Sequence, residues 1–335
     1  MNTPSKQATS RDVARLANVS QATVSRVLQG TTHVEPATRE AVMNAIAQLG
    51  YLPSLAARSM RTRRTDTVAL VVASLTVNPL FPTLLQLLSA ELRRHGLHST
   101  VWEAERFDEH TARSLVESPI DGVIVATAVN AATPYLARVA ERKPVVLVNR
   151  TVDSDDFDQV TSNNREGGRA VAAYFCDNGR RRIGLLSALQ HPGSTIQDRE
   201  TGFAEELLRR GVQLTDRDIA RVPNLSYDTG FRAAQEMLAN GHFDAIFCVN
   251  DIAAIGALDG VRRHGTAVPE RTWLVGYDDI PMCAWDCIGL TTMRQPAAQM
   301  VEQSVGLLRR RLAGEAGPPQ RILLPNALVR RTSAG

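Results

Sequence analysis

Residues 9–28 read TSRDVARLANVSQATVSRVL, and this stretch decides the fold of the N-terminal part of the chain. It predicts two short helices separated by a tight break at residues 18–19. Thr9 can cap the first helix and Ser20 the second, because a side-chain oxygen there accepts a hydrogen bond from a free amide of the first turn. Each helix has apolar residues at helical spacing, which we expect to face inward. They are Val13, Leu16 and Ala17 in the first helix, and Val24, Val27 and Leu28 in the second.

A third helix is predicted to begin at Pro36 and to end before Gly50. Proline suits the first position of a helix, and glycine suits the position just after its end. Val42, Ile46 and Leu49 form its apolar stripe. Three short helices in this order are typical of a helix-turn-helix module, in which the second helix enters the major groove of DNA.

The outward face of the second helix carries Gln21, Ala22 and Arg26. Arg26 can present two parallel N–H groups to guanine, and Gln21 can address adenine in a similar bidentate way. Short hydroxyl side chains, which suit phosphate oxygens, lie nearby. They are Ser20, Thr23 and Ser25. The alternative interpretation is an ordinary surface helical hairpin whose polar residues meet only solvent.

The charge of the chain is unevenly distributed, although the net charge is only +3. Residues 1–64 hold nine Lys and Arg and three acidic residues, whereas residues 65–335 hold 29 basic and 32 acidic ones. A basic N-terminal part on a slightly acidic body is typical of a protein that binds a polyanion.

From Thr67 onward the chain alternates short apolar runs with helical patterns. The apolar runs are VALVVAS, DGVIVAT, PVVLVN, RIGLLSA, AIFCVN and TWLVGY. Strands that are buried on both faces and alternate with helices predict parallel, doubly wound α/β sheets. Because these units are too many for one small sheet, we expect two similar lobes. The lobes should divide near Asn164, and the chain should return to the first lobe near residues 290–296.

Polar side chains follow several of the predicted strands. Asn149 and Arg150 close PVVLVNR, Asn250 and Asp251 close AIFCVND, and Asp278 closes LVGYD. Ligands of open α/β sheets bind beyond the carboxyl ends of the strands, so we expect these residues to line one cleft between the lobes. Amide, carboxylate and guanidinium groups each offer paired hydrogen-bonding atoms, which suit adjacent sugar hydroxyls. The alternative is the ordinary polarity of loops.

The segments DVARLANVSQATVSRVLQG, HVEPATREAV and LGYLPSLAARSM resemble the headpiece and hinge of the LacI/GalR family. The resemblance continues through VDSDDFDQVTSNNREGG, DRETGF, NDIAAIGAL, VGYDD and LTTMRQP, so it covers nearly the whole chain. It implies an all-α helix-turn-helix headpiece and a two-lobed α/β core like that of periplasmic binding proteins. The implied domains are residues 1–50 for the headpiece, 51–65 for the hinge helix and linker, 66–164 with 295–323 for the first lobe, and 165–294 with 324–335 for the second.

The family resemblance also implies roles for single residues. Gln21, Ala22 and Arg26 match the positions that read bases. The positions that touch or flank the DNA backbone are Thr9, Ser20, Thr23, Ser25, Gln29, His33, Thr38 and Tyr51. In the hinge, Ala57 and Met60 would enter the minor groove, with Met60 as an apolar wedge where the family usually has leucine. The positions that bind the effector are Phe81, Asn149, Arg150, Arg199, Asn250, Asp278 and Gln295.

In function, the resemblance implies a transcriptional regulator, typically a repressor, that binds a palindromic operator as a homodimer. A small effector, a sugar or sugar acid, would control it. The alternative is the same architecture with a purine or nucleoside as co-repressor. At Arg150 the chain resembles family members that sense sugars or sugar acids, which favours the first interpretation. The last residues, LVRRTSAG, show no heptad repeat, so we expect a dimer.

Other classes of protein fit the sequence less well. A dinucleotide-dependent enzyme needs a glycine-rich turn after its first strand, and VALVVASLTVNP has no glycine. We see no nucleophile elbow and no metal-spaced set of His and Glu, so we expect no catalytic site, cofactor or metal. A periplasmic sugar-binding protein would lack the headpiece and would begin with a signal peptide, and MNTPSKQATSRD has no apolar segment. We therefore expect a cytoplasmic protein that does not span a membrane.

Overall fold

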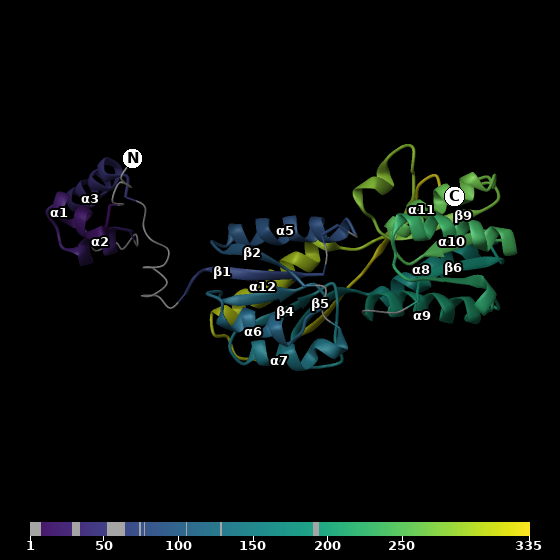
Figure 1. Ribbon diagram of the computed structural model, residues 1–335, viewed down its shortest axis with the longest axis horizontal. Coiled ribbons are helices and arrows are strands. Elements are labelled where there is room, and N and C mark those ends of the chain that lie inside the picture. Colours follow the sequence, from purple (N-terminus) through teal and green to yellow (C-terminus); the bar gives the residue numbers. More distant parts are fainter. Residues whose placement is uncertain are drawn as a thin grey trace, which may run out of the picture. The chain divides into compact units, whose positions relative to one another are not determined.

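The computed structural model describes residues 8–28, 34–51, 64–73, 75–76, 78–104, 106–127, 129–189 and 194–335. The chain divides into two compact units, Met1–Thr65 and Asp66–Gly335. Figure 1 shows the helices of the first unit and the two sheets of the second.

The first unit contains the predicted helices α1 (Ser10–Leu16), α2 (Gln21–Leu28) and α3 (Pro36–Leu49). Small apolar side chains from all three helices form its core. They are Val13, Ala14, Val24, Val27, Val42 and Ala45. Such short helices are marginal alone, so this shared core is what stabilises them.

Two residues that were predicted to face inward are exposed. Leu16 is 45% exposed and Leu28 is 40% exposed, so this part of the prediction is wrong. Each is the last residue of its helix, where the packed part of a short helix ends. Ala14 is buried in place of Leu16, because a small side chain lets the helices approach closely.

The predicted caps of these helices are confirmed. Thr9 and Asp12 form a capping box, in which the Asp12 amide donates to Thr9 Oγ1 (3.4 Å) and the Thr9 amide donates to Asp12 Oδ2 (3.0 Å). The Thr23 amide donates to Ser20 Oγ at 3.1 Å. Gly50 ends α3 with a φ of 56°, a left-handed conformation that favours glycine.

The first lobe of the second unit is built on a six-stranded sheet with the strand order β11-β5-β4-β3-β1-β2, and all its neighbouring strands are parallel. Its strands are β1 (Thr67–Val72), β2 (His98–Glu103), β3 (Gly122–Val125), β4 (Val145–Val148), β5 (Asp158–Ser162) and β11 (Arg321–Leu324). Helices α5 (Leu80–Arg94) and α12 (Ala297–Leu312) cover one face, and α6 (Glu109–Glu117) and α7 (Thr133–Ala140) cover the other (Figure 1).

Alternation along β1 shows why both faces need helices. Val68, Leu70 and Val72 pack in the cluster that includes α5 and α12. Ala69 and Val71 pack in the cluster that includes α6 and α7. The strand is therefore apolar on both sides, as parallel strands with two covered faces are.

The second lobe has a six-stranded sheet with the order β12-β10-β9-β8-β6-β7. Its strands are β6 (Ile183–Ala188), β7 (Ile219–Val222), β8 (Ala245–Cys248), β9 (Trp273–Asp278), β10 (Thr291–Arg294) and β12 (Ala327–Val329). Its helices are α8 (Asn164–Asp177), α9 (Ser194–Arg209), α10 (Tyr227–Asn240) and α11 (Asp251–Arg263). The neighbouring strands of this sheet are parallel, as predicted, except that edge strand β12 runs antiparallel to β10.

Short 3-10 helices complete the described elements. They are η1 (Asn130–Ala132), η2 (Asp216–Asp218) and η3 (Pro281–Ala284). In the part of the chain that the structure describes, no helix is both long and apolar enough to cross a membrane.

The chain passes between the two sheets three times, after β5, after β10 and after β11. Next to the first crossing, α8 and α9 pack backbone to backbone. A Cβ atom on Gly168 would lie 2.1 Å from the carbonyl oxygen of Arg199, and one on Gly202 would lie 1.9 Å from that of Arg165. Only glycine allows this approach, and it brings α9 with Arg199 close to the junction of the lobes.

Candidate functional site

Side chains from both lobes meet in a buried polar cluster around the end of β9, which we call the Asp278 cluster. Its members are Asn78, Arg150, Ser162, Asn164, Arg199, Tyr277, Asp278 and Gln295. Asn78, Arg150 and Ser162 belong to the first lobe, because they flank α5, β4 and β5. The cluster therefore joins the sheets of the two lobes.

Asp278 is the centre of the cluster. Gln295 Nε2 donates to its Oδ1 at 2.7 Å, and Asn78 Nδ2 donates to its Oδ2 at 3.1 Å. Arg199 Nη1 lies 3.2 Å from Oδ1, and the Asp278 side chain is 1% exposed. The φ of Asp278 is 121°, a conformation that favours glycine, so the surrounding contacts must hold the residue in place.

Arg199 is held on every side by groups of the second lobe. Its Nε donates to Asn164 Oδ1 at 2.8 Å and its Nη1 donates to the Val249 carbonyl at 2.7 Å. Its guanidinium carbon lies 3.7 Å from the centre of the Tyr277 ring. A buried cation needs such partners, because burying an unpaired charge is costly. Arg199 is therefore fixed as the partner of Asp278.

Gln295 links the lobes through its amide. Ser162 Oγ, at the end of β5 in the first lobe, donates to Gln295 Oε1 at 2.9 Å. The amide nitrogen of the same side chain donates to Asp278 in the second lobe. This hydrogen-bond chain is buried at each of its residues.

Three polar residues follow β3 and β4 at their carboxyl ends, and each has buried atoms without a hydrogen-bond partner among the described residues. These atoms are Thr127 Oγ1, Asn149 Oδ1, Arg150 Nε and Arg150 Nη1. Burial lowers the pKa of Arg150 to about 10, and the positive charge of Arg199 adds to this effect, while Asp278 opposes it. Buried polar atoms are nearly always bonded in native proteins, so these atoms make this edge of the sheet a candidate site for a ligand.

Asp251 is fully buried and lies near Asp278. Thr292 Oγ1 donates to its Oδ1 at 2.6 Å, and the Ile280 amide donates to its Oδ2 at 2.9 Å. Burial raises the pKa of the Asp251 carboxyl, and the negative charge of Asp278 adds to this. Because Ile280 follows Asp278 by two residues, Asp251 holds the turn that carries Asp278.

Asn250 and Phe81 have local roles in the structure. Asn250 caps α11, since its Oδ1 accepts from the Ala253 amide at 3.1 Å, and its Nδ2 donates to the Leu225 carbonyl at 3.3 Å. Phe81 lies in the first turn of α5 and is buried in the apolar core. Their contact with an effector stays a prediction.

In the first unit, the residues predicted to read bases lie on the exposed face of α2. Gln21, Ala22 and Arg26 are all exposed. Gln21 Nε2 donates to Ser10 Oγ at 2.7 Å, which ties the starts of α1 and α2 together. Ser20 Oγ lies 2.9 Å from Thr23 Oγ1. Thr38 and Tyr51 are half-buried.

Four of the predicted DNA contacts lie outside the described residues. They are Gln29, His33, Ala57 and Met60. Residues 52–63, which make up most of the predicted hinge helix, lie outside them as well.

Sequence reasoning missed several members of the site. They are Asn78, Thr127, Ser162, Asn164 and Tyr277. Thr127, Ser162 and Asn164 lie at or just beyond strand ends, so the rule that ligands bind beyond the carboxyl ends of strands contains a signal for them. Asn78 comes well after β1, and nothing in its local sequence indicates that it meets Asp278.

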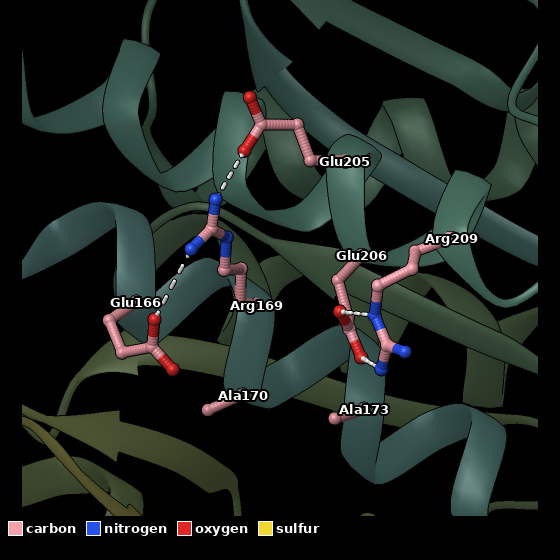
Figure 2. A pocket seen from close by; sticks show the side chains of 7 residues that line it. All are labelled: Glu166, Arg169, Ala170, Ala173, Glu205, Glu206 and Arg209. Atoms are coloured by element: carbon pink, nitrogen blue, oxygen red, sulfur yellow. Dashed lines mark hydrogen bonds and ion pairs between the residues drawn. The ribbon is translucent and has the colours of Figure 1, made fainter.

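A surface groove between α8 and α9 is a separate feature (Figure 2). Arg169 pairs with Glu205 at 2.9 Å, and Arg209 pairs with Glu206 through two hydrogen bonds of 2.7 Å each. Ala170 and Ala173 also line the groove. Because these charges already pair with one another, we do not assign the effector to this groove.

Comparison with known proteins agrees with this architecture. The family model described as bacterial regulatory proteins, lacI family, matches residues 9–54, and that of the periplasmic binding protein-like domain matches residues 172–334. The transcriptional regulator CelR of Thermobifida fusca is 33% identical over 331 residues, which cover 96% of each protein. This chain belongs to the LacI family. It is a transcriptional regulator with a helix-turn-helix headpiece and a two-lobed α/β core.

Further LacI-family proteins match over nearly their full length. The repressor PurR of Mannheimia succiniciproducens is 29% identical over 97% of this chain and 98% of its own. A solved CelR–cellobiose complex has a TM-score of 0.74 and 30% identity, covering 97% of this chain and 99% of that one. The Lac repressor dimer bound to operator and the anti-inducer ONPF has a TM-score of 0.87 and 26% identity, covering 98% and 99%.

Proposed function

We propose that this LacI-family regulator binds a palindromic operator as a homodimer, represses transcription there, and responds to a sugar or sugar acid at the Asp278 cluster. It acts in the cytoplasm and needs no catalytic site. In this proposal residues 1–50 are the headpiece, residues 51–65 the hinge, and the two lobes of the core bind the effector between them.

The observation that carries the effector site is the set of buried polar atoms contributed by both lobes. Asp278 and Arg199 come from the second lobe, and Asn149 and Arg150 follow β4 of the first. A ligand that contacts both sets favours one arrangement of the lobes over others. Its influence on the operator-binding state cannot exceed its difference in affinity for the two states.

A sugar fits the chemistry of these groups. The carboxylate of Asp278 accepts hydrogen bonds, the guanidinium of Arg150 donates them, and the amide of Asn149 can do both, which suits neighbouring hydroxyls. The related CelR has been solved in complex with cellobiose, which supports a carbohydrate. Because the chain is also similar to PurR, a purine co-repressor is the alternative effector.

The DNA-binding half of the proposal depends on the exposed face of α2. Gln21, Ala22 and Arg26 would read base edges, and the hydroxyls of Ser20 and Thr23 would contact phosphates. Ala57 and Met60 of the hinge would enter the minor groove. One such helix reads only a few base pairs, so a two-fold dimer on a palindrome supplies the specificity.

The test uses the full chain and an operator selected from random double-stranded DNA. We expect a palindromic site, one dimer per site in a gel shift, and a change in operator affinity on adding a sugar or sugar acid. A response to hypoxanthine or guanine, with none to sugars, would favour the co-repressor alternative. Equal affinity for selected and scrambled DNA would contradict the proposal.

A further inference from the structure

We propose that the effector carries an anionic group, a carboxylate or a phosphate, that pairs with Arg150. The inference rests on the proposed function, because it assigns the chemical class of the ligand at the Asp278 cluster. We therefore expect an acidic sugar or a sugar phosphate as the effector, and not a neutral sugar.

The first step in the argument is the contrast between the two arginines of the site. Arg199 has Asp278, the Val249 carbonyl and Asn164 Oδ1 as partners. Arg150 has two guanidinium nitrogens, Nε and Nη1, that are buried and unpartnered among the described residues. The negative charge of Asp278 acts on both arginines. The direct contact, of 3.2 Å, is with Arg199.

The second step is the charge of the site. Arg150, Arg199 and Asp278 together carry one excess positive charge. Asp251 lies near Asp278, and burial raises the pKa of its carboxyl to about 7, so at neutral pH it compensates only part of that excess. The lowered pKa of Arg150 still lies well above neutral pH, so its guanidinium remains charged in the cell. The free protein therefore holds at Arg150 a cation whose charge is only partly compensated.

The third step is what a ligand must supply. A neutral sugar can accept hydrogen bonds from Nε and Nη1, but it leaves the excess charge uncompensated in a poorly solvated place. A carboxylate or phosphate offers acceptor oxygens for these nitrogens, which lie on different edges of the guanidinium, and supplies the opposite charge as well. Thr127 Oγ1, also buried and unpartnered, can donate to the same anion. Arg150 is partly exposed as a residue, although its Nε and Nη1 are buried.

The decisive experiment compares matched ligands that differ in charge. Calorimetry with the full chain measures glucose against glucuronate and glucose 6-phosphate, galactose against galacturonate, and cellobiose against cellobionate. We expect one acid or phosphate to bind at least about tenfold more tightly than its neutral counterpart, with the difference shrinking as salt rises. Comparing the affinities of the sugar acids with that of glucose 6-phosphate shows whether the site binds a carboxylate or a phosphate.

Two variants connect this preference to Arg150. Arg150→Gln keeps a polar side chain but removes the charge, and we expect it to abolish the preference for the acid. Arg113→Gln is the matched control, because Arg113 lies on α6 and pairs with Glu117 outside the cluster. Without any ligand, Arg150→Gln should also unfold at a temperature about 2 °C or more above the parent, because it removes an unmatched charge.

The outcomes separate this inference from the proposed function. If a neutral sugar binds as tightly as its acid, or if Arg150→Gln keeps the preference, the anionic effector is wrong while a sugar-responsive regulator stands. If only purines bind, both fail. If Arg150→Gln is no more stable than the parent without ligand, the charge of Arg150 is already matched and the inference falls whatever the ligand.

Discussion

Asn78 and Asp278 are joined by a hydrogen bond of 3.1 Å across 200 residues of sequence. Asn78 lies just before α5 in the first lobe, and Asp278 is the last residue of β9 in the second. The bond can therefore form only in some arrangements of the lobes. Asp278 also contacts Gln295 and Arg199, so one carboxylate belongs to the proposed effector site and also contacts both lobes.

We expect Asp278→Asn to bind its operator normally and to lose its response to the effector. The amide keeps the shape of the carboxylate but removes the negative charge that pairs with Arg199 and accepts hydrogen bonds from hydroxyls. We expect this loss to weaken effector binding by about 1.5–3 kcal/mol. Asparagine is chosen over alanine because it leaves less of the buried cluster unpartnered. Operator binding titrated with the effector measures the midpoint. A midpoint equal to that of the parent would remove Asp278 from the site.

Arg26→Ala should lose discrimination between the selected operator and scrambled DNA. The exposed guanidinium on α2 is suited to a bidentate contact with guanine, and its loss costs about 1–3 kcal/mol per half-site. Fluorescence anisotropy with both DNAs gives the ratio of affinities, and effector binding by calorimetry should not change. Arg113→Ala, on the surface of α6 in the second unit, serves as the control. An unchanged ratio would show that Arg26 does not read bases.

Gly168→Ala should destabilise the second lobe by about 1–3 kcal/mol and weaken effector binding. The added Cβ would meet the Arg199 carbonyl oxygen at 2.1 Å, so α8 and α9 would have to separate and carry Arg199 with them.

Gly306→Ala on α12 is the matched control for Gly168→Ala. No atom lies within 4 Å of its added Cβ among the described residues, so alanine should stabilise that helix by about 0.5–1 kcal/mol. Urea unfolding measures both variants. Equal stability of Gly168→Ala and Gly306→Ala would contradict the close packing of α8 and α9.

The stability of the core should depend on pH through Asp251. Burial raises the pKa of this carboxyl above its unfolded value of about 3.9, with Asp278 adding to the shift. A group with a raised folded pKa stabilises the fold fully below its unfolded pKa, and that contribution is lost as pH rises through the folded pKa. The free energy of unfolding of the parent should therefore fall, relative to Asp251→Asn, as pH rises above about 4.

The measurement for Asp251 is urea unfolding of parent and Asp251→Asn at a series of pH values. The asparagine loses one of the two acceptor oxygens for Thr292 and Ile280, which lowers the free energy of unfolding at every pH. The two proteins are therefore compared by how this free energy changes with pH and not by its absolute value. Parallel slopes would mean that Asp251 stays charged in the folded protein.

Much of the site could be predicted from local sequence. Local sequence predicts Asn149, Arg150 and Asp278 as site residues, because polar residues at the ends of apolar strands gather at one edge of a sheet. Arg199 and Gln295 came only from the family resemblance, since a helix residue and a loop residue carry no local signal of their partners. Asn78 was missed because its partner is distant in sequence.

The sequence by itself determined the elements of this protein. The caps at Thr9 and Ser20, the cores of the helices and the buried strands depend on neighbours a few residues away, and local patterns contain that information. Only the tertiary structure decided that Leu16 and Leu28 are exposed, that β12 is antiparallel, and that Arg199 and not Arg150 holds Asp278. These outcomes depend on which surfaces meet across two lobes, and packing between distant segments sets them.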